Sequence, residues 1–469
     1  MTKPRDLERF PLGRAWVVAQ WLILAGVLFF VVITLRGETP QQDPAPAGPA
    51  LELSLRRALD LALAPDGNAR VAIAKEMVAE ARARSGQARA DLLPNVDGTV
   101  SQSSQTRNLQ AFGIQIAIPI PGFEQPRFAG PYDVFDARLS ATQTIFSMSA
   151  IRRYQASREG ISVARAEEEL TRQNVSASVV KAYYNAQRAK AQQVAAEANL
   201  ALARELEGLT TNQKSAGTGL AVEVTRASVQ RSQAEQVLLV RQNELRAAQL
   251  QLLRLIGLSL SGEVALSDEL QAPLDEEPSL PGALERATNE RPDWQSQQSR
   301  LKNADLLASA SKWERAPSIA AFGDYGASGN TPGNSLPTRA VGVQMRVPVF
   351  DGGRREARRA EALARQREEE LRTRDLKQQI ELELRLALDA LQSTKDQVRV
   401  ARQSLSQAEL ELEQAQRRYR AGVANSLEIT RAQTSVEQAR GNNIDSLYRY
   451  NAARVDYALA LGDVANAIP

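Results

Sequence analysis

The chain has 469 residues, of which 43% are hydrophobic, 24% are charged and only 5% are aromatic. This mixture predicts long helices rather than a compact mixed core. The formal net charge is only +3, so bulk charge gives no reason to expect a nucleic-acid partner. Cysteine and histidine are both absent, so we expect no disulfide, no cysteine-linked lipid anchor and no Cys/His metal site. We find no nucleophile–base pair and no phosphate-binding loop, and we therefore expect neither an enzyme nor a cofactor.

The N-terminal segment carries basic residues and then an apolar run, from Trp16 to Leu35, that no charge interrupts. This order is typical of a secretory signal, and residues 45–47 (Ala-Pro-Ala) offer a cleavage site. The run is also long enough to span a bilayer, so a retained transmembrane helix is the alternative. We expect cleavage and treat residues 1–50 as an export segment followed by a linker.

The strongest pattern in the sequence is an internal duplication. Residues 222–227 (VEVTRA) recur as 427–432 (LEITRA), an offset of 205 residues. The same offset relates an Ala-Gly pair near each of these segments and an apolar-Gly pair after each of them. Several anchors in one register indicate two copies of one unit. We therefore divide the chain into a first repeat (51–257), an equatorial linker (258–281) and a second repeat (282–469).

Both copies follow the same plan. A helix is expected at about 54–90 and again at about 282–314, ended by Pro94 and Pro317, because proline cannot continue the hydrogen-bond ladder of a helix. An extended region, one very long helix, a glycine turn and a shorter helix follow. The extended region of the first copy is 19 residues longer, and we assign the excess, around 114–131, to a longer loop between its two strands.

Two extended stretches alternate apolar and polar residues, a period of two that is typical of a strand with one apolar face. Their apolar members are Phe135, Ala137, Leu139, Ala141 and Ile145 in the first copy and Val341, Val343, Met345, Val347 and Val349 in the second. A length of about ten residues fits a membrane strand. The partner stretches, about 96–106 and 319–327, are small and polar, which favours a water-filled lumen. An ordinary half-buried sheet is the alternative.

If these strands cross a membrane, one chain cannot complete the sheet. Lipid cannot satisfy the hydrogen bonds of an open edge, and the smallest usual single-chain barrels have about eight strands. Four strands per chain therefore require that several chains share one barrel.

The second copy contains a run from Arg354 to Ala421 with neither glycine nor proline. As a helix, this run would extend for about 100 Å. It carries an a/d heptad seam in which large residues are followed, three positions later, mostly by alanine. The large members are Leu384, Leu391, Val398, Leu405, Leu412 and Tyr419, and the first copy repeats the small half with Ala182, Ala189, Ala196 and Ala203. We expect Gly160 and Gly208 to bend or fray the long helix of the first copy.

Four motifs, in this order, resemble the TolC-like outer-membrane efflux protein family. They are an entry helix at 53–62 (LSLRRALDLA), a helix-to-strand junction at 92–94 (LLP), a strand-to-helix junction at 347–353 (VPVFDGG) and a helix tip at 419–422 (YRAG) followed by 427–429 (LEI). Each motif is weak alone, but their order and the duplication are specific together. The resemblance covers about residues 51–463.

This resemblance implies a mainly α-helical fold with a small membrane β part. Three chains would form an α-barrel of long-helix hairpins, continuous with a shared β-barrel of twelve strands, four from each chain. The trimer would lie in the outer membrane of a Gram-negative bacterium, in contact with its lipid, with the helices extending into the periplasm. The segments near 258–282 and the chain ends would form an equatorial layer.

The resemblance also implies a channel of a tripartite efflux or secretion system. Such a channel conducts passively to the exterior what an inner-membrane pump delivers through a periplasmic adaptor protein. The alternative is a periplasmic coiled-coil scaffold, anchored in the inner membrane by a retained segment 16–35. A scaffold explains the heptad seam but neither the strands nor the duplication. The sequence identifies neither the substrate nor the class of pump.

The glycine turns between paired helices match the positions at which the family docks its adaptor. Glycine permits the positive φ of a sharp reversal and lets a partner's backbone approach closely. A plain helix–helix turn is the alternative. The candidates are Ala216, Gly217, Thr218 and Gly219 in the first copy and Ala421, Gly422, Val423 and Ala424 in the second.

Glu223 and Glu428 match positions where the family places acids at the pore entrance. A narrow ring of such carboxylates attracts cations and repels anions. Arg226 and Arg431 lie three residues further on, where ion pairs with these acids would lock a closed state; solvated surface pairs are the alternative. The chain departs from the family in two places: Arg431 stands where a second acid is usual, and Ala424 replaces the gating arginine.

Overall fold

The computed structural model describes residues 51–65, 67–109, 111, 113, 127–273, 280–421 and 423–464. The expected export segment, Gly422 and most of the loop expected at 114–131 lie outside these residues. Among the helices that the structure describes, none combines the length and the apolar character needed to cross a membrane.

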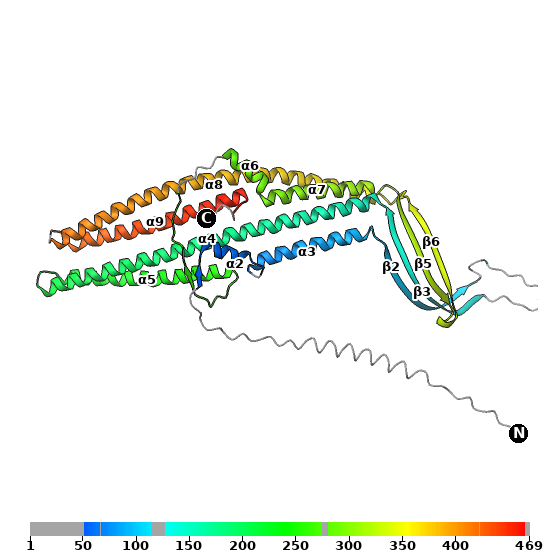
Figure 1. Ribbon diagram of the computed structural model, residues 1–469, viewed down its shortest axis with the longest axis horizontal. Coiled ribbons are helices and arrows are strands. Elements are labelled where there is room, and N and C mark those ends of the chain that lie inside the picture. The colour runs from blue at the N-terminus through cyan, green and yellow to red at the C-terminus, as the bar shows by residue number, and fades with distance from the viewer. Residues whose placement is uncertain are drawn as a thin grey trace, which may run out of the picture. The chain divides into compact units, whose positions relative to one another are not determined.

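The described fold is mainly α-helical with a small β part, as expected, and one order of elements occurs twice (Figure 1). The recurrence supports the division into two repeats, which stays a prediction. The first set contains α2 (Leu55–Leu63), α3 (Ala69–Ala90), β2 (Asn95–Asn108), β3 (Phe128–Phe146), α4 (Met148–Ser215) and α5 (Ala221–Leu255). The second contains α6 (Leu280–Glu290), α7 (Pro292–Trp313), β5 (Ser318–Gly329), β6 (Ser335–Arg346), α8 (Arg354–Arg420) and α9 (Ser426–Leu461).

Each entry helix is broken in two, whereas the sequence analysis expected one continuous helix in each copy. The first break follows Leu63, and the Asn68 side chain caps α3 by accepting a hydrogen bond from Arg70 N at 2.9 Å. The second break precedes Pro292, whose ring suits the first turn of α7 but cannot continue α6.

A left-handed glycine packs against each of these breaks. A Cβ atom on Gly257 would lie 2.0 Å from the carbonyl oxygen of Gly67, and a Cβ atom on Gly462 would lie 2.7 Å from Arg291 Cα. Both glycines have positive φ and follow the last helix of their copy. Only glycine fits at these two positions. The glycine of each duplicated apolar-Gly pair therefore packs against the break in the entry helix of its own copy.

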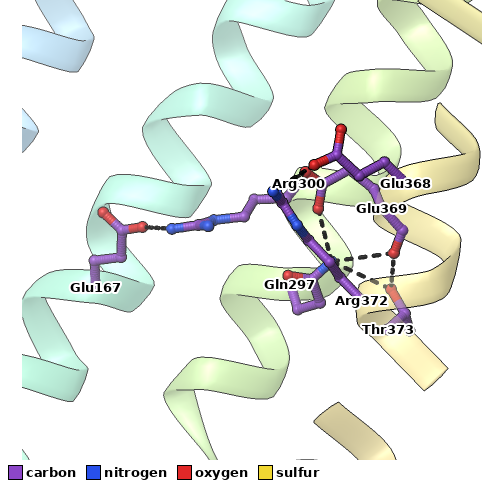
Figure 2. Close-up of polar contacts among 7 residues, drawn as sticks. All are labelled: Glu167, Gln297, Arg300, Glu368, Glu369, Arg372 and Thr373. Carbon is purple, nitrogen blue, oxygen red and sulfur yellow. Dashed lines mark hydrogen bonds and ion pairs between the residues drawn. The ribbon is translucent and has the colours of Figure 1, made fainter. Parts of the chain in front are cut away.

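Helices α3, α4, α7 and α8 form a layer in which each packs on the next. Polar contacts tie the layer together, as Figure 2 shows for three of its helices. Arg300 of α7 pairs with Glu167 of α4, and Gln297 of α7 donates to Glu369 of α8 at 2.8 Å. Nearer the sheet, Glu314 of α7 lies between Arg153 of α4 and Arg358 of α8 and pairs with both.

The largest apolar core surrounds the short parallel pair β1 (Leu51–Leu53) and β4 (Val264–Leu266), beside α2 and α4. Tyr183 of α4 is fully buried there, and its hydroxyl lies 2.8 Å from Asp268 Oδ2 and 2.9 Å from the carbonyl oxygen of Leu53. Burial, reinforced by the neighbouring carboxylate, raises the pKa of Tyr183. Burial acts to raise the pKa of Asp268 as well, but hydrogen bonds from Leu55 N, Tyr183 and Ser267 hold it below its usual range.

The heptad seam of α8 is confirmed, and it packs on α9. Five of its six large members are buried, namely Leu384, Leu391, Val398, Leu412 and Tyr419. Three of the four small residues predicted in α4, Ala189, Ala196 and Ala203, are buried too, and Ala182 is partly buried. The expectation for Gly160 and Gly208 was wrong as to fraying, because α4 continues through both glycines without interruption.

The four longer strands form one antiparallel sheet in the order β2-β3-β5-β6. Cross-strand partners show that one face is largely apolar: Ala141 lies opposite Val96 and Gly323, and Gly323 lies opposite Val341. The neighbouring rows on this face carry Leu139 with Tyr325 and Ala321 with Val343, and end in Arg339 and Gln143. Val341 is 90% exposed. Among the residues that the structure describes, β2 and β6 each have one partner strand, so both edges of this sheet are unpaired there.

The other face of the sheet is polar, and the strands are longer than expected. Arg138 pairs with Asp136 on its own strand and lies 3.4 Å from Asp324 on β5. Strand β3 has 19 residues and begins at Phe128, so residues 128–131 of the expected loop are strand. The strand expected to reach 349 ends at Arg346 instead.

The core beside β1 and β4 generates a stability prediction. Tyr183→Phe removes a hydroxyl that is buried against a carboxylate, and we expect it to cost about 2 kcal/mol in the free energy of unfolding. Thermal unfolding of the detergent-solubilised protein measures this. Tyr184→Phe is the matched control, because no hydrogen bond of the Tyr184 hydroxyl is found among the described residues. Equal melting temperatures for the two variants would contradict the role given to Tyr183.

Candidate functional site

The turn between α4 and α5 requires its glycines. Gly217 has a φ of +77°, in the left-handed region. The backbone N–H groups of Thr218 and Gly219 both donate to the carbonyl of Gln213 at 3.0 Å, which closes the end of α4. A Cβ atom on Gly219 would lie 2.9 Å from Lys214 N. The turn is thus compact, with Leu220 left 66% exposed beside it.

The turn between α8 and α9 has the same plan. Ala421 ends α8, and the N–H of Val423 donates to the carbonyl of Arg418 at 3.1 Å. Asn425 caps α9 by accepting a hydrogen bond from Glu428 N at 3.1 Å. Val423 is 67% exposed. Both turns therefore present small residues with an exposed apolar side chain, and the docking role of these residues stays a prediction.

The two candidate acids occupy equivalent places in the first turns of α5 and α9. A carboxylate is favoured there by the partial positive charge of a helix N-terminus. The structure does not form the expected lock: in the described part of the chain, neither Arg226 nor Arg431 makes an ion pair with these acids. Glu428 Oε1 instead lies 3.2 Å from Arg418 Nε across the turn, and Glu223 Oε1 accepts a hydrogen bond from Ser426 Oγ at 3.3 Å.

Besides Glu223 with Ser426, several contacts between the two helix pairs involve uncharged residues that the sequence analysis missed. The Tyr419 hydroxyl of α8 donates to Gln213 Oε1 of α4 at 2.8 Å. Gln230 of α5 donates to Gln433 of α9 at 2.8 Å and accepts from Thr430 at 3.2 Å. The only signal in the sequence was the position of Tyr419 at the end of the heptad seam.

An apolar cluster supports these contacts. Leu206 and Ala227 from the first helix pair are buried together with Leu412, Tyr419 and Ile429 from the second. Burial, together with the negative charge of Glu223, raises the pKa of Tyr419, so its hydroxyl stays a neutral donor at physiological pH. The tips are thus joined mainly by neutral hydrogen bonds and apolar packing, together with the ion pair between Arg420 of α8 and Glu205 of α4 at 3.4 Å.

A groove of about 570 Å³ lies beside this junction, between α4, α5 and α9. Glu223, Arg226 and Gln230 line one wall, and Thr430 and Glu437 line the other. Within the described residues, no group of three or more acidic side chains is arranged to hold a metal ion. The groove offers mixed charge and hydrogen-bonding groups, which suit contacts with a protein or passing solutes.

The tip contacts generate a prediction about local opening. Tyr419→Phe removes the hydrogen bond to Gln213, worth about 1 kcal/mol, so amide hydrogen exchange at the ends of α4 and α8 should become about fivefold faster. Tyr448→Phe is the control, because its hydroxyl makes no hydrogen bond among the described residues while its ring stacks under Arg188 at 4.6 Å. Unchanged exchange at both tips in Tyr419→Phe would contradict the link.

Comparison with known protein families gives a match over most of the chain. The family described as outer membrane efflux protein matches residues 59–258 and 283–463. No match was found among curated protein sequences.

Solved structures show the same fold. A membrane protein from Pseudomonas aeruginosa is 21% identical, with a TM-score of 0.75 over 91% of this chain and 100% of that one. The open state of the MtrE outer membrane channel of Neisseria gonorrhoeae is 19% identical, with a TM-score of 0.73 over 92% and 96%. The CmeC outer membrane channel of Campylobacter jejuni is 20% identical, with a TM-score of 0.71 over 88% and 86%.

Proposed function

The chain belongs to the outer membrane efflux protein family, and we propose that it is one protomer of a homotrimeric channel in the outer membrane of a Gram-negative bacterium. The observation that carries this proposal is the sheet β2-β3-β5-β6, which has one apolar face, one polar face and two unpaired edges. In lipid, both edges need partners, which neighbouring copies of the chain supply. Three copies would give twelve strands around a lumen lined by the polar face.

The long helices would continue this lumen into the periplasm. We propose that the channel conducts passively, within a tripartite system, what an inner-membrane pump delivers through a periplasmic adaptor. The exposed turns at 216–219 and 421–424 are the proposed docking points for the adaptor. Their compact backbone and exposed apolar neighbours, such as Val423, support this assignment.

Opening would require the two helix pairs of a protomer to move apart at their tips. Such a movement breaks the contacts that join the pairs, chiefly Tyr419 with Gln213 and Gln230 with Gln433. An adaptor that binds the separated state more tightly would shift the equilibrium towards it. Neutral contacts predominate where Arg226 and Arg431 were expected to act, and the ion pair between Arg420 of α8 and Glu205 of α4 is exposed at both side chains. An exposed pair contributes little, so we expect opening to depend weakly on ionic strength.

We propose that Glu223 and Glu428 line the pore entrance, six carboxylates in a trimer. The variant Glu223→Ala with Glu428→Ala should lose about half or more of its preference for cations in planar bilayers, because the focused negative field is removed. Reversal potentials in a salt gradient measure the preference. The control is Glu263→Ala with Glu269→Ala, which removes the same charge from exposed equatorial positions. Unchanged selectivity in the tip variant would refute the pore-entrance role.

The rival function is a scaffold anchored in the inner membrane by residues 16–35. N-terminal sequencing of the mature protein and fractionation of the two membranes separate the proposals. A processed chain in the outer membrane is expected for the channel. An intact N-terminus in the inner-membrane fraction would favour the scaffold.

A further inference from the structure

The layer formed by α3, α4, α7 and α8 has two unlike sides. One side carries a groove of about 720 Å³ lined by all four helices. The charges in this groove are largely neutralised in pairs, such as Arg300 with Glu167 and Arg372 with Glu368 (Figure 2). This side therefore presents little net charge.

The opposite side is basic. Successive positions on a helix differ by about 100°, so a residue two positions from a groove residue faces the other way. Eight exposed cations lie two positions from residues that line the groove, and one of them, Lys302 of α7, is neutralised by Glu159 of α4 at 2.7 Å. Arg89 lies two turns beyond another of the eight. Without Lys302, the set consists of Lys75, Arg82 and Arg89 on α3, Arg158 and Arg165 on α4, Lys312 on α7, and Arg367 and Arg374 on α8. We call this set the basic band.

The basic band is not neutralised by its neighbours. Among the described residues, none of its eight members makes an ion pair. Two acids on the same side are already paired, Glu169 with Arg172 at 3.5 Å and Glu356 with Arg315. The carboxylates left there are Glu370 and Asp305, and Asp305 accepts a hydrogen bond from Gln366. Eight free cations against two carboxylates leave an excess of six positive charges on each chain.

The basic band faces outward if the layer is part of a closed wall. This step rests on the proposed function, in which three layers close into a cylinder. A groove that spans four adjacent helices marks the concave side of the layer, and the concave side of a closed wall faces the lumen. The basic band then faces the periplasm.

The basic band lies directly below the membrane sheet. Arg89 is one residue from the end of α3, and β2 begins at Asn95. Lys75 lies 14 residues earlier, which is about 21 Å along the helix.

On α3 and α4 the side chains between the cations are small, as at Ala79, Gly86 and Ser162. Exposed apolar side chains on this side come only from α7 and α8 among the described groove helices, namely Trp313, Leu363 and Leu371. The cations of α3 and α4 therefore lack the neighbouring apolar side chains that insertion into lipid headgroups needs, and a compact protein epitope needs large buried anchors.

We propose that the basic band binds peptidoglycan through the carboxylates of its peptide chains. Within α3, α4 and α8, cations recur every seven residues, about 10.5 Å apart. The pattern repeats on several helices and, in a trimer, around the whole wall. Regularly spaced single cations suit a repeating polyanion. Each cation makes a weak and independent contact with one anionic group, and the binding energies of these contacts add.

Co-sedimentation of the purified full-length protein with isolated peptidoglycan sacculi tests this proposal. The test variant carries Arg82→Gln, Arg158→Gln, Arg165→Gln and Arg367→Gln. The control carries Arg204→Gln, Arg246→Gln, Arg254→Gln and Arg402→Gln, which removes the same charge from exposed positions outside the basic band. We expect the wild type and the control to bind, with affinity falling as salt rises, and the test variant to bind about tenfold more weakly.

Amidation of the peptidoglycan carboxylates should reduce wild-type binding to the level of the test variant. Three results would overturn the proposal: equal binding by wild type and test variant, equal loss in the control, or binding only to vesicles that contain phosphatidylglycerol. Conductance in planar bilayers separates this proposal from the channel itself. Normal conductance without sacculus binding refutes the basic band alone, whereas a wild type that binds sacculi but conducts no current refutes the channel.

Discussion

The backbone hydrogen bonds that are missing at the two edges of the sheet constrain the rest of the structure. In the described part of the chain, β2 and β6 each pair on one side only, so a row of backbone N–H and C=O groups is left open at both edges. In water such an edge is tolerable, but in hydrocarbon each unsatisfied group costs several kcal/mol. The apolar face, with Val341 90% exposed, cannot be left in water without cost either. The proposed arrangement, in which the face lies in lipid and further copies of the chain close the edges, would satisfy both demands.

The helices face a different constraint, because a layer one helix thick cannot enclose an apolar core. The layer α3-α4-α7-α8 is held by polar contacts such as Gln297 with Glu369 and by close packing of small residues. Apolar cores appear where more elements meet, around Tyr183 beside β1 and β4 and around Leu412 near the turns that end α4 and α8.

Much of the architecture could be predicted from sequence periodicity. The seven-residue spacing of Leu384, Leu391 and Val398 predicted a buried seam, and alternation around Leu139 predicted a strand with one apolar face. Both are found. The breaks in the entry helices were missed although Pro65 and Pro292 mark them, because apolar residues continue on either side of each proline.

The contacts of the site were less predictable, because they join residues that are distant in sequence. Glu428 was expected to pair with Arg431 one turn away, but Arg418 reaches it from the preceding helix. Tyr419 and Gln213 are 206 residues apart, and no local pattern relates them. The basic band illustrates the same limit: its spacing is visible in the sequence, but its excess charge appears only once the neighbouring helices show which acids are already paired.

Disulfide cross-linking between the two sheet edges tests the central claim most directly. The chain has no cysteine, so introduced thiols have no competitors. One cysteine at Val100 of β2 would be combined in turn with single cysteines along β6, from Leu336 to Gln344. If neighbouring chains close the sheet, some combinations will give covalent dimers and trimers in native membranes, and reduction will return monomers. Monomers alone from every combination, in protein that is folded and inserted, would contradict a shared barrel.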